Sequence, residues 1–282
     1  MPMLLIKGTF RLKGTQPDGD TVHFVADDPE EWKLVRAKNP VQVAGGGEVK
    51  LRFEGIDALE THYHGEHQPL PLGRAAAAEL LTWLGFNQVL RDHDETVTAS
   101  TPESTPGYIL TQGTDIYHRV VALVGRGAPP MPSGTDVTVD VPLLRQTANH
   151  HLAARGLVYP TFYRTLFRDL RLELTAAAEQ ARTAQQGLWP KDVSTTGFKI
   201  TALSTITADV VILPKLFRRL VDHLHLGLSV SCFPAYLAGK EDKVTVLSTG
   251  ERFVGLQHVV SVSNGDTVRL LHPVEDLLFD EA

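Results

Sequence analysis

One stretch, residues 51–61, constrains the fold more than any other part of the chain. It reads LRFEGIDALET, a β-strand that runs into a polar loop. Arg52 interrupts the apolar strand, and Asp57 and Glu60 stand where regular structure ends. Strict alternation would place Arg52 and Asp57 on opposite faces of a strand. They serve one site only if the chain bends near Gly55, a residue suited to a bend.

Two further motifs carry charges of the same kinds. Upstream, DGDTV at residues 18–22 holds two carboxylates, and downstream, DIYHR at residues 115–119 ends in a second arginine. Carboxylates can hold a hard divalent cation, and arginines can neutralise a phosphate. Each residue alone also fits a turn or an exposed surface position. Taken together, they are the parts needed to cut a phosphodiester.

The composition of the chain limits how such a site could bind nucleic acid. The 282 residues suffice for one large domain or two ordinary ones. The formal net charge is −6, whereas proteins that bind nucleic acid through many phosphate contacts are usually basic. Any such contact should therefore be local to a cleft or screened by a bound cation. Cys232 is the single cysteine, which rules out an internal disulfide and argues against a zinc finger.

The sequence also predicts where in the cell the protein is located. No stretch approaches 18 apolar residues, so no membrane span is expected. The apolar run at the N-terminus is too short for a signal peptide and lacks a small-residue cleavage site. We expect a cytoplasmic protein, with the reservation that export without a signal peptide leaves no trace in a sequence.

The order of predicted elements divides the chain in two. Residues 1–190 predict a barrel-like set of short strands with three helices. Residues 191–197 resemble a linker, and residues 198–282 predict a small, separate β-rich domain that contains one short helix. The three helices of the first part are expected at about residues 73–85, 143–154 and 164–186. In the second part we expect the helix over residues 214–225, strands over 208–213 and 228–232, and a hairpin turn at Asn264-Gly265.

Over about residues 4–190 these pieces resemble the thermonuclease (staphylococcal nuclease-like) family. Each piece is weak alone, but their order and spacing together are specific. The resemblance implies a five-stranded OB barrel with three helices, an α+β fold. It rests on DGDTV at 18–22, Arg52-x4-Asp57-x2-Glu60-Thr61, GRA at 73–75, DxYxR at 115–119, RGLVY at 155–159 and GLWP at 187–190.

The resemblance implies one calcium ion and its ligands. The family's ligands fall on Asp20, Asp57 and the backbone carbonyl of Ala58. The family usually has Thr at that last position, and a carbonyl ligand survives the change to alanine. Leu59 stands where the family usually has proline, which bears on the rigidity of the loop rather than on its chemistry.

The resemblance also implies roles for charged and aromatic residues. Glu60 falls on the carboxylate that orients or deprotonates the attacking water, and Arg52 and Arg119 fall on the arginines that clamp the phosphate. Tyr159 and Tyr163 are expected near the nucleotide-binding pocket. Tyr117 is expected at the substrate too, where together with Asp115 it would shape the turn that aims Arg119.

The function expected from these residues is calcium-dependent endonucleolytic cleavage of DNA and RNA, with little sequence preference and with 3′-phosphate products. One alternative is a non-catalytic OB module that binds single-stranded nucleic acid or a protein partner. Another is a different metal-dependent hydrolase that uses His62, His64 and His67, although a solvated loop is the simpler interpretation of these histidines. The role of residues 198–282 is open between recruitment of a protein partner, regulation of the nuclease and a structural cap. The sequence leaves the oligomeric state undetermined.

Overall fold

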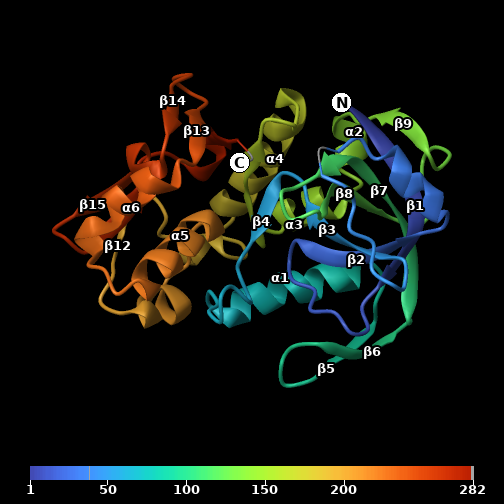
Figure 1. The fold of residues 1–282 in the computed structure, drawn as a ribbon, viewed down its shortest axis with the longest axis horizontal. Helices are drawn as coiled ribbons and strands as arrows, with labels where there is room; N and C mark the ends of the chain where they lie inside the picture. The colour runs from blue at the N-terminus through green and yellow to red at the C-terminus, as the bar shows by residue number, and fades with distance from the viewer. Residues whose placement is uncertain (38, 281–282) are drawn as a thin grey trace.

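A closed five-stranded β-barrel forms one half of the molecule (Figure 1). The structure is a computed structural model in which residues 1–37 and 39–280 are described. The strands follow the order β2-β3-β8-β7-β1, and pairing between β1 and β2 closes the barrel. The predicted five-stranded barrel is confirmed, whereas its assignment to the OB type remains a prediction. The barrel strands are β1 (Pro2–Arg11), β2 (Thr21–Ala26), β3 (Glu48–Phe53), β7 (Ser104–Thr114) and β8 (Val120–Arg126).

Strand β1 is long enough to close the barrel and also to carry an additional strand. One of its edges pairs along residues 4–11 with β7. The other edge pairs with β9 (Thr135–Thr138) through residues 2–5 and with β2 through residues 8–11. Its inward side chains, such as Ile6 and Phe10, are fully buried. Closure leaves the barrel without a free edge along most of β1.

Four α-helices, rather than the predicted three, lie within the described part of residues 1–190. The helix predicted over residues 143–154 is two helices, because the Thr147 side chain accepts a hydrogen bond from the amide of His150 and starts a second helix there. No helix among the described residues combines the length and apolar character needed to cross a membrane. The four helices are α1 (Leu70–Trp83), α2 (Val141–Leu144), α3 (Ala148–Ala154) and α4 (Arg168–Thr183).

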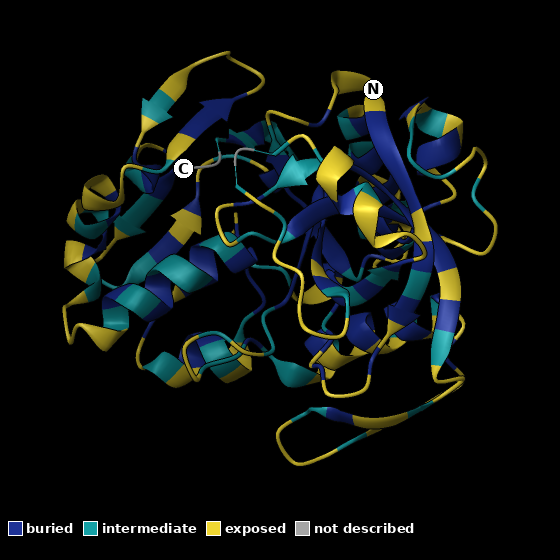
Figure 2. Ribbon diagram, turned by 45° about the vertical axis from the view of Figure 1, so that its right-hand side comes forward, coloured by how far each residue is buried: buried dark blue, intermediate teal, exposed yellow. Residues whose placement is uncertain are grey.

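Short elements extend from the barrel. The hairpin of β5 (Gln88–Arg91) and β6 (Val97–Thr101) projects away from it (Figures 1 and 2). A 3-10 helix, Pro29–Leu34, follows β2 and buries Trp32. Strand β4 (Ile56–Ala58) leaves the barrel and pairs with β10 (Val158–Pro160).

The C-terminal part is mixed rather than β-rich. The helix predicted over 214–225 is confirmed as α5 (Pro214–His225), and a second, α6 (Phe233–Lys240), follows it. Asn264 and Gly265 both have positive φ at the predicted hairpin turn. The remaining strands are β11 (Phe162–Tyr163), β12 (Phe198–Lys199), β13 (Lys243–Val246), β14 (Arg252–Val254), β15 (Val260–Ser263), β16 (Thr267–Leu270) and β17 (Leu277–Phe279).

Two predicted strands of this part were wrong. The segment over 208–213 overlaps a π-helical turn, Thr205–Asp209, and only Val211 forms an isolated bridge. The segment over 228–232 contains a 3-10 turn in which the Ser229 side chain accepts a hydrogen bond from the amide of Ser231. Apolar runs this short do not distinguish strand from turn, so local capping decides their conformation.

Packing crosses the predicted linker at residues 191–197. Tyr159 and Trp189 share a continuous apolar cluster with Phe217 and Phe233 of the C-terminal part. Strand β11 also pairs in parallel with β17. Figure 2 shows buried residues on both sides of this boundary. The two parts therefore share a core. The division into two domains at residues 191–197 remains a prediction.

We predict that Phe217→Ala lowers the free energy of unfolding by about 3–5 kcal/mol, the usual cost of removing a buried phenylalanine ring. Phe217 is fully buried in α5, within the shared cluster. Denaturant unfolding followed by circular dichroism measures this loss. Leu226→Ala, on an exposed side chain just after the same helix, is the matched control and should have little effect.

Candidate active site

A cleft of about 700 Å³ opens between one end of the barrel and the C-terminal part. Barrel residues line one wall, and residues of α5 and of the segments around Asp242 and Asp280 line the other. Eight of the nine site residues predicted from the sequence line this cleft. They are Asp20, Arg52, Asp57, Ala58, Glu60, Tyr117, Arg119 and Tyr163.

The bend that the sequence required lies at Gly55, between β3 and β4. Gly55 has φ +77°, a conformation that other L-residues rarely adopt. A Cβ atom there would also lie 2.7 Å from Leu174 Cδ1. The bend allows Arg52 of β3 and Asp57 of β4 to reach the same cleft.

The loop that carries Asp18 and Asp20 lies against the 51–61 stretch. The Asp20 amide donates to Asp18 Oδ1 at 3.0 Å, and the Ala58 amide donates to Asp20 Oδ2 at 2.8 Å. A Cβ atom on Gly19 would lie 2.6 Å from the Cβ of Ala58 and 2.7 Å from that of Ala76 in α1. Glycine at this position therefore allows the loop to approach both elements.

Arg52 is buried beneath an aromatic ring. Its guanidinium carbon lies 5.0 Å from the centroid of the Tyr163 ring. Burial opposes the charge, but Tyr163, Asp57 and Asp20 together raise the pKa of Arg52. Burial alone would raise the pKa of Tyr163, yet Arg52, Lys215 and Arg218 lower it. At the Tyr163 hydroxyl these positive groups therefore outweigh both burial and the Asp57 charge.

Arg119 is held by its own turn. Its Nε and Nη2 atoms each lie 2.7 Å from Asp115 Oδ2, while Asp115 Oδ1 accepts hydrogen bonds from the amides of Tyr117 and Arg119. The Arg119 guanidinium also lies 5.5 Å from the centroid of the Tyr117 ring. Asp115 thus orients Arg119, as the sequence suggested.

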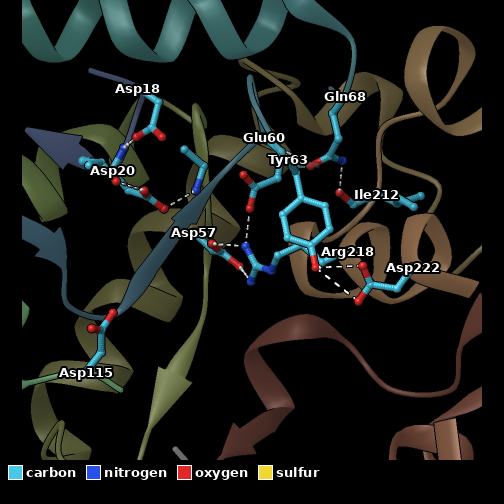
Figure 3. A network of polar contacts seen from close by, with 12 residues as sticks. Asp18, Asp20, Asp57, Glu60, Tyr63, Gln68, Asp115, Ile212, Arg218 and Asp222 are labelled. Atoms are coloured by element: carbon cyan, nitrogen blue, oxygen red, sulfur yellow. Dashed lines mark hydrogen bonds and ion pairs between the residues drawn. The ribbon is translucent and has the colours of Figure 1, made fainter. Parts of the chain in front are cut away.

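A third arginine, which the sequence analysis did not identify, reaches the same carboxylates (Figure 3). Arg218 of α5 places Nη2 2.9 Å from Asp57 Oδ2 and Nη1 3.3 Å from Asp57 Oδ1. The same Nη1 donates to the Glu60 carboxylate. The C-terminal part therefore contributes directly to the site.

No protein-family model matches the chain, and no curated protein matches it either.

The buried charges of the site perturb one another. Burial, with the Asp57 charge, raises the pKa of Asp20. Burial raises the pKa of Glu60 despite the neighbouring Arg218, and Asp57 and Asp20 add to the rise. For Asp57 the outcome is the opposite, because Arg218 and Arg52 outweigh its burial and lower its pKa. Of Asp20, Asp57 and Glu60, only Asp57 thus has a lowered pKa.

Two further contacts attach the loop after Glu60 to the C-terminal part. The buried Gln68 accepts a hydrogen bond from the Glu60 amide at 3.1 Å and donates to the carbonyl of Ile212 at 2.8 Å. The Tyr63 hydroxyl contacts both carboxylate oxygens of Asp222, at 3.0 and 3.1 Å. Figure 3 shows both contacts beside Arg218. They join segments about 140–160 residues apart, so no local motif signals them.

Tyr159 is the predicted site residue that the structure does not bring to the cleft. Its side chain is fully buried, its hydroxyl donates to Asp192 Oδ1 at 2.7 Å, and its ring packs against Trp189. The Tyr159 side chain therefore lies outside the cleft in which a nucleotide is expected to bind. Its backbone still pairs with Asp57 and so supports β4.

The three histidines after Glu60 do not converge on one point. His62 contacts the Thr61 hydroxyl, His67 contacts the Gln68 carbonyl, and His64 Nδ1 lies 3.2 Å from Asp222 Oδ1. Within the described residues, no group of three or more His, Cys, Asp or Glu side chains is arranged to hold a metal ion. The histidine loop thus gives no support to the metal-hydrolase alternative.

The donor chemistry of the cleft nevertheless fits a hard divalent cation. Asp18, Asp20, Asp57 and Glu60 are all oxygen donors, and mutual repulsion contributes to the raised pKa values of three of them. Buried carboxylates that repel one another are stabilised by added positive charge. Arg218 already supplies part of that charge, at the oxygens of Asp57.

We predict that Asp18→Asn raises the melting temperature at pH 8 by about 2–4 °C, the shift that 1 kcal/mol causes in a chain of this size. Burial, followed by the charges of Asp20 and Glu60, raises the pKa of Asp18 well above its ordinary value. A raised carboxyl pKa favours the folded state below about pH 4, and this stability is lost as the pH rises through the raised value. Asparagine mimics the protonated form and retains the acceptor for the Asp20 amide.

Thermal unfolding in a chelator between pH 4 and 8 measures this effect. The gain should shrink towards pH 4, where the native Asp18 is itself protonated. Asp94→Asn, on an exposed carboxylate, is the matched control. A gain that is equal at both pH values would contradict the explanation.

Proposed function

We propose that the chain is a divalent-cation-dependent nuclease that hydrolyses phosphodiesters of DNA and RNA, with calcium as the expected ion. The observation that carries the proposal is the convergence of Asp20, Asp57 and Glu60 with Arg52 and Arg119 in one cleft. The order and spacing of the same residues resemble the thermonuclease family, and the closed barrel is compatible with that resemblance.

The residues of the cleft suit distinct parts of the reaction. Asp20, Asp57 and the carbonyl of Ala58 would hold the cation, which when bound neutralises phosphate charge and positions water. Burial raises the pKa of Glu60, which makes this carboxylate a better proton acceptor near neutral pH. As water attacks phosphorus, Glu60 takes its proton and the bond to the 5′-oxygen breaks. The 5′-oxygen takes up a proton from water, so the products are a 3′-phosphate and a 5′-hydroxyl.

The arginines would stabilise the charge that builds on phosphorus. Arg52 is fixed beneath Tyr163, and Arg119 is fixed by Asp115. Guanidinium groups held in place before the reaction need little rearrangement as charge develops. The site thus requires only a few positive groups, which is consistent with a net charge of −6.

A second candidate is the non-catalytic module that binds single-stranded nucleic acid or a protein. The observation that favours it is the contact of Arg218 with both Asp57 and Glu60, because these carboxylates are the ones the reaction needs. Cleavage assays distinguish the two candidates, since a binding module retains affinity for nucleic acid but does not cut it.

We predict that Glu60→Gln and Arg119→Ala each lower the rate of calcium-dependent cleavage by about 10²–10³, as removal of one transition-state contact typically does. Rates on labelled single-stranded DNA and on RNA, with calcium and with a chelator, measure this loss. Arg126→Ala is the matched control, because Arg126 ends the strand that follows Arg119 but lies over Trp83, outside the cleft. A folded native chain that cuts nothing with any divalent ion would contradict the proposal and favour the binding module.

We also predict that a single strand is cut faster than the same strand in a duplex. Asp57 and Arg52 are only 2% and 8% exposed, at the floor of a cleft with walls on two sides. A cleft of about 700 Å³ has the size of a small-ligand site and cannot enclose a duplex. Rates for one labelled strand, free and annealed, test this prediction, and equal rates would contradict it.

A further inference from the structure

Arg218 occupies the position at which the proposed function needs a cation. Its guanidinium donates to both oxygens of Asp57, at 2.9 and 3.3 Å, and to Glu60 as well. Asp57 is the expected cation ligand and Glu60 the expected water-activating carboxylate. One side chain of the C-terminal part thus contacts two key groups of the proposed reaction.

The rest of α5 holds Arg218 in this position. Phe217 and Leu220 anchor one face of the helix in the shared core. On the other side, Arg219 forms two 2.7 Å hydrogen bonds with Asp242, and Asp222 accepts from Tyr63. The Arg218 side chain therefore extends from a helix that is anchored on two sides. Figure 3 shows it reaching Asp57 and Glu60.

A guanidinium and a divalent cation cannot both occupy the Asp57 carboxylate in this way. Calcium binds carboxylate oxygens at about 2.3–2.6 Å. Because both oxygens of Asp57 already accept from Arg218, a cation bound there would lie next to a second positive group. Repulsion between two such charges at contact distance is strong in a buried site. Binding of the cation therefore requires Arg218 to withdraw from Asp57.

We propose that Arg218 is the resident counter-ion of Asp57 and Glu60, and that it sets the affinity of the site for a divalent cation, which has to displace it. Arg218 acts through these two carboxylates, so it is a positioning residue. The inference rests on the proposed function, because it takes Asp57 as a cation ligand. It also gives the C-terminal part a role, because this part sets the cation concentration at which the site fills.

Calcium titration calorimetry on the full chain tests the inference. Arg218→Met retains the apolar stem and removes the competing charge. It should bind calcium about tenfold more tightly than the native chain, a change of about 1.4 kcal/mol. Arg218→Lys keeps the charge without the fork, so its affinity should lie between the two. Arg182→Met is the matched control, because Arg182 also pairs with a carboxylate of the C-terminal part, Glu275, at 2.7 and 3.0 Å, but outside the cleft.

The outcomes separate the inference from the proposed function. Tighter binding by Arg218→Met, with no change in Arg182→Met, supports the inference. If both Arg218 variants bind calcium no more tightly than the native chain while the native chain binds calcium and cuts, only the inference is overturned. If the native chain neither binds calcium nor cuts, both are overturned. Should Arg218→Met fail to fold, the affinity of Arg218→Lys decides.

Discussion

Negative charge buried at one end of the barrel is the constraint on which the arrangement of the site depends. An unpaired buried carboxylate is costly, and several of them also repel one another. Arg52 supplies compensating charge from the barrel, and Arg218 supplies it from helix α5. The C-terminal part is therefore connected to the barrel by electrostatics in addition to the shared apolar core. The proposed reaction would use groups whose charges this balance already controls.

The barrel could be predicted from the sequence because its strands carry regular patterns. Thr21 to Val25 alternates, and the only bend that the 51–61 stretch required falls on Gly55. The C-terminal part was predicted less well. Its apolar segments are short, so conformation there depends on local contacts such as the turn at Ser229, and on packing against residues distant in sequence.

The site also contains residues that a local pattern identifies and residues that depend on contacts distant in sequence. Short motifs identified the charged residues that line the cleft, and the family resemblance added Ala58, Tyr117 and Tyr163. A bent strand and two turns bring the charged residues together. Arg218 could not be found in this way, since it meets Asp57 across 161 residues. Tyr159 shows a different limit: its backbone pairs with Asp57, yet its side chain points to Asp192 and Trp189. Position in a motif does not reveal which side of a strand a ring will face.

The separation of Asp57 from Arg218 also affects how the protein is made. A ribosome adds about 5–20 residues per second, so roughly 8–32 s pass between the synthesis of these two residues. During that time the carboxylates of the nascent chain have Arg52 but no guanidinium from α5, so water or free ions supply the rest of the compensating charge. The order of synthesis thus exposes these carboxylates to cellular cations before Arg218 exists.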